Sequence, residues 1–264
     1  RVYVANHVTD EVAVIDTATN SIVATISFPP GSTPNYLAIT PDGSRVYVTL
    51  LGLPDAVSVI DTATNDIMAT ILLADGSDPM KIAITPDGSR AYVANFGNDT
   101  VSVINTLTNT IQLNINLQPG SNPRDLAVTP DGTRVYVANY GNDTVDVIDT
   151  AMNTVINTII FANGSNPRAI AITPDGSRVY VVNETVDEVV VVQTSNDVTL
   201  ATIPLPVSSS PFDIAITPDG SRAYVLLFNL GSSAVIDTAS NTVIANLPAG
   251  DSTRAIAITP ILLF

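Results

Sequence analysis

Short hydrophobic segments separated by turn residues recur along the whole chain. In one example, residues 169–173 alternate Ala with Ile, and residues 179–182 are a run of β-branched and aromatic side chains. Both patterns are typical of half-buried and buried strands. Between them stands Pro-Asp-Gly-Ser at positions 174–177. Proline fixes φ, aspartate hydrogen bonds the nearby backbone, and glycine adopts the positive φ of a tight hairpin. The segment therefore predicts a strand, a tight turn and a second strand.

The same pattern repeats with a period of 44 or 45 residues, seen most clearly in the tyrosine that follows each turn. The tyrosines are Tyr3, Tyr47, Tyr92, Tyr136, Tyr180 and Tyr224. Self-similarity at this period indicates a propeller or a solenoid. The third repeat shows four strand-like segments, at residues 90–95, 100–104, 110–116 and 126–129. Four short antiparallel strands with turns between them describe a propeller blade.

The two ends of the chain indicate how such blades would close into a ring. Residues 1–6 match the strand that elsewhere follows the Pro-Asp-Gly turn, and residues 255–260 match the strand that elsewhere precedes it. Pairing them would complete a blade and remove two exposed sheet edges. We therefore predict an all-β, six-bladed β-propeller with four antiparallel strands per blade. It would form a single domain over residues 1–264, with repeats at about 1–44, 45–89, 90–133, 134–177, 178–221 and 222–264.

Composition narrows the function classes. Hydrophobic residues make up 45% of the chain and charged residues 13%, which fits strands buried on both faces. No apolar run is long enough to span a bilayer. The formal charge of −15 disfavours nucleic acid and anionic membranes as partners. Because the chain has no cysteine and one histidine, disulfides, thiolate metal sites, cysteine nucleophiles and histidine clusters are excluded.

Three phrases carry a resemblance to a known repeat: residues 134–139 (RVYVAN), 147–150 (VIDT) and 171–176 (AITPDG). They resemble the YVTN-family β-propeller repeat, which is found in archaeal surface-layer and bacterial cell-surface proteins. The resemblance covers the whole chain and implies a propeller at the cell surface or outside the cell. Members of that family often have seven blades, so six blades would be a departure from it. The repeated residues build blades and say little about function.

The ten basic residues occupy only two positions of the repeat. Six open the strand after the turn: Arg1, Arg45, Arg90, Arg134, Arg178 and Arg222. We expect this first set to bridge to turn aspartates or backbone carbonyls, because guanidinium groups suit such fixed contacts. Exposed pairs of this kind contribute at most about 1 kcal/mol each.

The second set of basic residues opens the strand that precedes the turn. Its members are Lys81, Arg124, Arg168 and Arg254, and the matching places elsewhere include Asn35, Met80 and Phe212. If this strand is the innermost one, these residues form a partly positive ring at one mouth of a central channel. Lys81, Arg124, Arg168, Arg254, Asn35 and Phe212 are therefore the candidate ligand-binding residues, for a carboxylate, sulfate or phosphate. The alternative is that the cations pair with nearby acids, namely Asp78, Asp125, Asp213 and Asp251.

Enzyme chemistry has little support in the sequence. A Ser-His-Asp triad would depend on the single histidine, His7, and no signature of one is present. Four asparagines, Asn6, Asn95, Asn139 and Asn183, recur at the end of the strand after the turn. Their oxygens suit Ca²⁺, but recurrence in four repeats favours a capping role toward turn amides. We predict no catalytic residue and no cofactor, with Ca²⁺ as the one candidate.

The sequence thus favours a non-catalytic, monomeric propeller, extracellular or at the cell surface. It would bind a protein partner or a small anionic ligand at the channel mouth, where the loops differ most between repeats. Two alternatives stay open: a channel-mouth enzyme such as a Ca²⁺-dependent lactonase or lyase, and a structural scaffold with no ligand.

Overall fold

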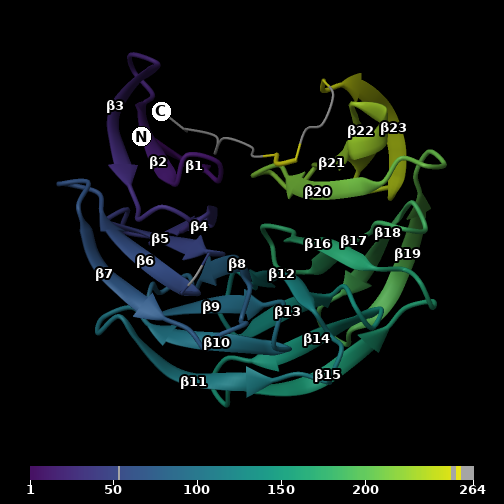
Figure 1. The fold of residues 1–264 in the computed structure, drawn as a ribbon. Helices are drawn as coiled ribbons and strands as arrows, with labels where there is room; N and C mark the ends of the chain where they lie inside the picture. Colours follow the sequence, from purple (N-terminus) through teal and green to yellow (C-terminus); the bar gives the residue numbers. More distant parts are fainter. Residues whose placement is uncertain (53, 251–253, 257–264) are drawn as a thin grey trace. The chain divides into compact units, whose positions relative to one another are not determined.

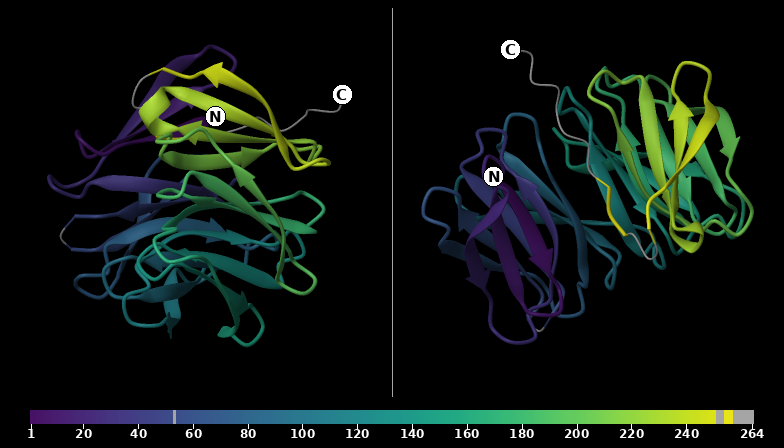
Figure 2. Two further views of the ribbon diagram at one scale, coloured as in Figure 1. Left: turned by 90° about the vertical axis from the view of Figure 1, so that its right-hand side faces the viewer. Right: turned by 90° about the horizontal axis from the view of Figure 1, so that it is seen from above.

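The chain folds into antiparallel sheets joined by short turns (Figure 1), and Figure 2 shows the same sheets from two further directions. The computed structural model describes residues 1–52, 54–250 and 254–256. Within these residues the strands form six sheets, five of four strands and one of three. Contacts divide the chain into two compact units, Arg1–Leu126 and Ala127–Phe264. Each unit is described by itself.

The first unit holds three sheets whose strands follow chain order. They are β1 (Val2–Asn6), β2 (Glu11–Asp16) and β3 (Ser21–Ser27); then β4 (Pro34–Ile39), β5 (Arg45–Leu50), β6 (Ala56–Asp61) and β7 (Ile67–Leu72); then β8 (Pro79–Ile84), β9 (Arg90–Asn95), β10 (Thr100–Asn105) and β11 (Thr110–Asn116). Strand β12 (Pro123–Val128) crosses the boundary between the units and begins the sheet β12-β13-β14-β15.

The second unit continues the same arrangement. It contains β13 (Arg134–Asn139), β14 (Thr144–Asp149) and β15 (Thr154–Ile160); then β16 (Pro167–Ile172), β17 (Arg178–Asn183), β18 (Glu188–Gln193) and β19 (Val198–Pro204); then β20 (Pro211–Ile216), β21 (Arg222–Leu227), β22 (Ser232–Asp237) and β23 (Thr242–Pro248). A short 3₁₀ turn, η1 (Phe228–Leu230), is the one helical segment in the described part of the chain.

The repeat pattern predicted these sheets well. The four-stranded antiparallel blade is confirmed, and the sheet at the chain start has three strands, as its sequence predicts. One boundary differs: the strand expected at 126–129 begins at Pro123, because proline is tolerated as the first residue of a strand. Most of the closing strand expected at 255–260, and the tail after it, lie outside the described residues. Ring closure and a single closed domain therefore stay predictions.

The core is built from strands that are buried on both faces. In β17, Val179 and Val181 belong to a cluster with residues of β14, while Tyr180 and Val182 belong to one with residues of β21 and β22. All four side chains are 0% exposed. Fully burying a side chain of valine's size contributes about 1.5–3 kcal/mol. Alternate residues of one strand therefore hold it between two neighbouring sheets.

Arginine and tyrosine, two residues apart on one strand, link four of the sheets to a turn of the next sheet in the same unit. In the second unit, Arg178 Nη1 donates to the Thr238 carbonyl at 2.5 Å and the Tyr180 hydroxyl donates to Asn241 Oδ1 at 2.8 Å. We call such a pair the Arg–Tyr link. The corresponding arginine bonds join Arg1 to Thr62, Arg45 to Thr106, and Arg134 to Thr194. The predicted bonding to backbone carbonyls is confirmed for these four arginines, but the carbonyl belongs to the following sheet. Arg222 instead pairs with Asp237 of its own sheet at 2.6 Å, the other predicted kind of contact.

The Pro-Asp-Gly turn is closed by its aspartate. In the turn between β8 and β9, Asp87 accepts from the Thr85 hydroxyl at 2.5 Å and from the Ser89 amide at 3.0 Å. Gly88 has φ of +72°, the left-handed conformation that the sequence predicts there. The Thr85 hydroxyl bond, followed by the Ser89 amide bond, lowers the pKa of Asp87 from 3.8 to about 2. The ionised carboxylate therefore stabilises the turn above pH 3.8, and this contribution is lost as the pH falls toward 2.

Replacing Thr85 by valine tests this turn. Valine keeps the shape and removes the hydroxyl, so we expect the pKa of Asp87 to rise toward 3.8. Carboxyl ¹³C shifts followed by NMR titration would measure it. The pKa of Asp42, lowered to about 2 by the equivalent Thr40 bond, serves as the internal reference and should not move. An unchanged Asp87 pKa would contradict the proposed cause.

Three buried asparagines make a second repeated contact. Asn139 is 0% exposed, and its Nδ2 donates to Asp146 Oδ2 at 2.7 Å. Because a carboxylate only accepts, the amide orientation is fixed and Oδ1 points elsewhere, buried and without a partner. Asn183 is held in the same way by Glu188 at 3.0 Å. In β5 and β21 the matching residues are Leu50 and Leu227.

Asn139→Leu introduces the residue that β5 and β21 have at this position, and it removes one hydrogen bond from Asp146. Since Asp146 is 2% exposed, we expect a loss of about 2 kcal/mol in the free energy of unfolding. Chemical denaturation would measure it. Asn95→Leu is the matched control, because its partner Ser102 is a neutral hydroxyl whereas Asp146 is a buried carboxylate. Adding Asp146→Ser, which reproduces Leu50 with Ser58 in β5 and β6, should restore stability. Failure of the double variant to recover would contradict this account.

Candidate functional site

Four of the candidate ligand-binding residues lie where the first strand of a four-stranded sheet departs from regular pairing: Asn35, Lys81, Arg168 and Phe212. The register of β16 with β17 shifts between Pro167 and Ala169, which leaves Arg168 at a bulge. The register of β20 shifts in the same way around Phe212. In β8 the irregularity extends from Pro79 to Ile82, which is why its cation, Lys81, stands one place later. Bulges redirect side chains and are frequent beside functional sites.

Arg168 and Glu184 form an ion pair in the second unit. Arg168 Nη1 lies 2.7 Å from Glu184 Oε2, and the two side chains are 8% and 18% exposed. The hydroxyl of Ser210 donates to the other carboxylate oxygen at 3.2 Å. Arg168 comes from the start of β16, Glu184 from the turn between β17 and β18, and Ser210 from the loop before β20. Three segments of the unit therefore meet at one carboxylate.

Aromatic rings continue this site. The guanidinium carbon of Arg168 lies 3.4 Å from the centre of the Phe212 ring. Phe212 stacks on Phe228 with ring centres 5.3 Å apart and an interplanar angle of 26°. Arg254 lies over Phe228 at 5.8 Å. These distances are within cation–π range. The structure therefore brings three candidate residues of the second unit, Arg168, Phe212 and Arg254, into one stack through Phe228.

Glu184 occupies a position that is aromatic in three other repeats, as Phe96, Tyr140 and Phe228. Two of these rings meet an arginine that follows the next loop: Phe96 with Arg124, and Phe228 with Arg254. In the repeat before Phe228, the turn residue is Glu184 and the residue after the next loop is Phe212. Glu184 was not among the ligand-binding residues predicted from sequence. Aligning the turns on the repeat period would have revealed this exchange of charge and ring.

A pocket of about 350 Å³ opens at Glu184. Its lining residues are Tyr140, Glu184, Thr185, Asp187, Ser208, Ser210 and Asn229. Most of them carry a hydroxyl, amide or carboxylate, and Tyr140 adds a ring. The pocket therefore offers both donors and acceptors around a carboxylate that a buried guanidinium holds in place.

Aspartates in two turns accept hydrogen bonds from the loops that precede β16 and β20. Asp187 accepts the amides of Ser208 at 2.6 Å and Ser210 at 2.9 Å. Asp143 holds Gly164 and Asn166 in the same way, both at 2.8 Å. Asp187 and Asp143 have positive φ, of 53° and 59°, a conformation that aspartate tolerates better than most residues. Asp143 therefore fixes the loop that leads into β16, and Asp187 fixes the loop that leads into β20.

The candidates of the first unit have other contacts. Lys81 pairs with Asp125 at 3.7 Å, which confirms the alternative that this cation pairs with an acid, and it lies 5.1 Å from the Tyr36 ring centre. Arg124 lies 6.0 Å from the Phe96 ring centre. Asn35 Nδ2 donates to the sulfur of Met80 at 3.6 Å. Whether the cations of both units face one channel mouth stays a prediction.

The asparagines that were weighed as Ca²⁺ ligands against a capping role have the following contacts. Asn6 Oδ1 accepts the amides of Val8 and Thr9, which is the predicted capping role. Asn139 and Asn183 turn their nitrogens, and not their oxygens, toward the nearest carboxylates. Among the residues that the structure describes, no three acidic or histidine side chains are grouped to bind a metal. In the same residues no helix has the length and hydrophobicity needed to cross a membrane.

A double-mutant cycle tests the ion pair. Glu184→Gln alone leaves the buried guanidinium without its carboxylate, so we expect a loss of about 3 kcal/mol in the free energy of unfolding. Arg168→Met with Glu184→Gln should recover most of that loss. Lys81→Met with Asp125→Asn is the control cycle; since Lys81 is 30% exposed, its coupling should stay below about 1 kcal/mol. Equal coupling in both cycles, measured by denaturation, would contradict the special role of Arg168.

Comparisons with known proteins agree with the propeller architecture. The chain resembles the structure titled Kuenenia stuttgartiensis hydrazine synthase, with a TM-score of 0.85, 23% identity, and coverage of 95% of this chain and 84% of that one. It resembles virginiamycin B lyase from Staphylococcus aureus, with a TM-score of 0.82, 17% identity, and coverage of 93% and 80%. A catalytically inactive variant of that lyase, with a histidine replaced by alanine and quinupristin present, gives a TM-score of 0.80 at 17% identity, covering 92% and 78%. At these identities the likeness shows the fold alone.

A comparison with curated proteins found no match. A family model described as "Lactonase, 7-bladed beta-propeller" matches residues 2–227. The finer resemblance to YVTN and surface-layer repeats stays a prediction, and the described residues form six sheets where the family description has seven blades. Because the matched segment covers most of the sequence, the chain belongs to the lactonase family of β-propellers.

Proposed function

We propose that the chain is an enzyme that opens cyclic esters, with Glu184 as its general base and Arg168 as the residue that positions Glu184. The observation that carries the proposal is the buried guanidinium held 2.7 Å from a carboxylate that lines a pocket. Family membership supports a ring-opening reaction on a lactone. This favours the alternative of a lactonase or lyase over the non-catalytic module expected from sequence.

The geometry suits hydrolysis of a lactone. Glu184, as general base, takes a proton from a water molecule, and the water oxygen bonds to the ester carbonyl carbon. The negative charge that develops on the carbonyl oxygen is stabilised by N–H and O–H donors of the pocket lining, such as Asn229 and Ser208. Arg168, which is outside the lining, holds the Glu184 carboxylate in place. The ring C–O bond then breaks, and the leaving oxygen takes the proton from Glu184. The product is a hydroxy acid.

A turnover assay tests the proposal. Purified protein is incubated with a panel of γ- and δ-lactones and with quinupristin, and products are analysed by mass spectrometry. Hydrolysis adds the mass of one water, whereas elimination by a lyase leaves the mass unchanged. For any compound that the wild type opens, Glu184→Gln should lower kcat by about 10²-fold or more. Glu188→Gln is the matched control, because Glu188 bonds Asn183 and does not line the pocket.

His7 provides a second discriminator. It is the only histidine of the chain and is exposed in the turn after β1, and the inactive lyase variant lacks a histidine. Loss of turnover in His7→Ala, with full turnover in Glu184→Gln, would place the chemistry at His7 and contradict the proposal. Melting curves with Ca²⁺ and with EDTA test the metal-dependent alternative, since a ligand that binds the folded state raises the melting temperature.

A second candidate is binding of a small anion at the arginine–ring stack, without turnover. The stacking of Arg168 and Arg254 on Phe212 and Phe228 favours it, because rings hold both guanidinium groups at one face of the second unit. A carboxylate-dependent rise in melting temperature that Arg168→Met abolishes, with no product from any lactone, would support this function. Protein partners, the extracellular or cell-surface location and the monomeric state stay predictions.

A further inference from the structure

Three grooves lie beside the Arg–Tyr links. Those at Arg45 and Arg178 are each lined by two turn aspartates, and the one at Arg1 has no aspartate. Two are in the first unit, with volumes of about 370 and 410 Å³, and one is in the second unit, with about 420 Å³. Each is lined by the linking arginine and by the threonine whose carbonyl accepts from it. These pairs are Arg45 with Thr106, Arg1 with Thr62, and Arg178 with Thr238.

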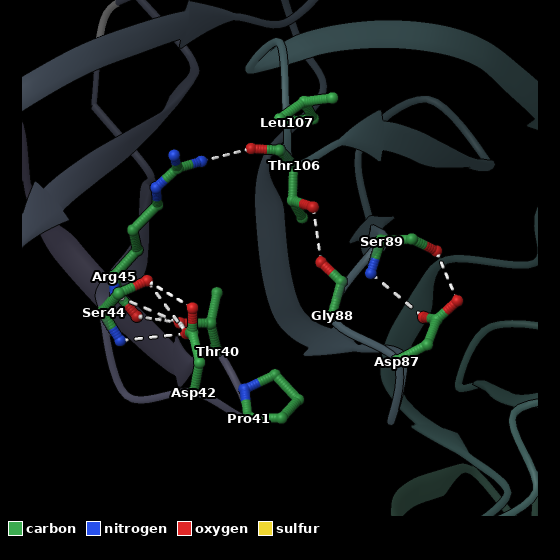
Figure 3. Close-up of a pocket in the computed structure, with 10 residues that line it drawn as sticks. All are labelled: Thr40, Pro41, Asp42, Ser44, Arg45, Asp87, Gly88, Ser89, Thr106 and Leu107. Carbon is green, nitrogen blue, oxygen red and sulfur yellow. Dashed lines mark hydrogen bonds between the residues drawn. The ribbon is translucent and has the colours of Figure 1, made fainter.

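Figure 3 shows the first of these grooves. The guanidinium of Arg45 extends to the Thr106 carbonyl, with the turns of Asp42 and Asp87 beside it. Pro41 and Leu107 supply apolar surface, and Leu107 is 83% exposed. The groove therefore combines an N–H donor, two carboxylate acceptors, hydroxyls and an apolar wall.

This lining selects for hydroxyl groups. A ligand must donate to the carboxylates and accept from the guanidinium, and a hydroxyl does both. An anionic ligand would face Asp42 and Asp87 and the formal charge of −15. A simple cation would face Arg45 and use none of the groove's donors. A sugar ring presents hydroxyls at its rim and C–H groups on its face, which suit Pro41 and Leu107.

We propose that these grooves bind a neutral polysaccharide, one sugar unit in each. Because the groove recurs in neighbouring sheets of the first unit, one polymer chain or a surface dense in sugar can occupy several grooves. Weak binding at each groove is then multiplied by effective concentration. This proposal does not depend on the reaction proposed at Glu184, which lies in a separate pocket.

Affinity electrophoresis of the full chain tests the proposal. The chain is run through native gels that contain soluble neutral glucans, dextran or a mixed-linkage β-glucan, and through gels that contain alginate or no polymer. We expect retardation by at least one neutral glucan and none by alginate. Absence of retardation by both glucans, or retardation by alginate alone, would overturn the proposal.

A triple variant locates the binding. Ala63→Asp, Leu107→Asp and Ala239→Asp place a carboxylate in each groove at an exposed position. We expect the dissociation constant for the glucan, taken from retardation against polymer concentration, to rise at least about tenfold. Val8→Asp, Ile160→Asp and Val207→Asp add the same charge at sites 86%, 78% and 87% exposed that line none of the grooves, and should bind as the wild type does.

Mobility in polymer-free gels corrects for the added charge, and melting curves confirm that both triple variants fold. Retained glucan binding in the groove variant would overturn the assignment to the grooves. Equal loss in the two triple variants would overturn it as well, because general charge would then explain the effect. Leu107→Ala offers a milder test: it converts the first groove to the composition of the second unit's groove, which has Ala239 at that place.

Discussion

The hydrogen bonds of the Arg–Tyr link set how one sheet sits on the next. Apolar packing between sheets is strong but tolerant of sliding, because the facing surfaces are mostly valine, isoleucine and alanine. A guanidinium on a specific carbonyl and a tyrosine hydroxyl on a specific amide allow one position. Burial raises the pKa of the Tyr47 and Tyr180 hydroxyls, so both remain donors at any ordinary pH. The grooves and the pocket at Glu184 keep their shapes because these contacts fix the sheets within each unit.

The pocket of the proposed reaction lies where the repeat is broken. Most blade positions hold the same residue type in every sheet and are explained by folding. The exchange at Glu184 and Phe212 departs from that rule, and it turns an arginine–ring contact into a buried ion pair with a pocket beside it. A propeller fold by itself hosts many unrelated activities. Ring-opening chemistry is therefore supported by the site at Glu184 and by the family, and not by the architecture.

Local signals made the blades predictable from sequence. The Pro-Asp-Gly turn and the alternating strands involve residues close together in the chain, so strand order and turn conformation follow directly. Sequence predicted that these arginines bind turn aspartates or backbone carbonyls, but it did not predict which turn they reach. Every repeat offers an equivalent turn, so the sequence does not distinguish the turn of the arginine's own repeat from that of the next repeat. Arg168 and Phe212 were found among the candidates. Glu184 was missed because it reaches Arg168 only through the bulge in β16, which no local pattern reveals.

The Arg–Tyr link also bears on how such chains change length during evolution. In four repeats the linking arginine binds a turn of the following repeat, and that turn stands at the same place of the repeat each time. Duplication or deletion of one unit by unequal recombination therefore yields a chain whose new junction already has matching partners. Relatives with different numbers of blades can arise in single genetic steps, without compensating substitutions at the joins.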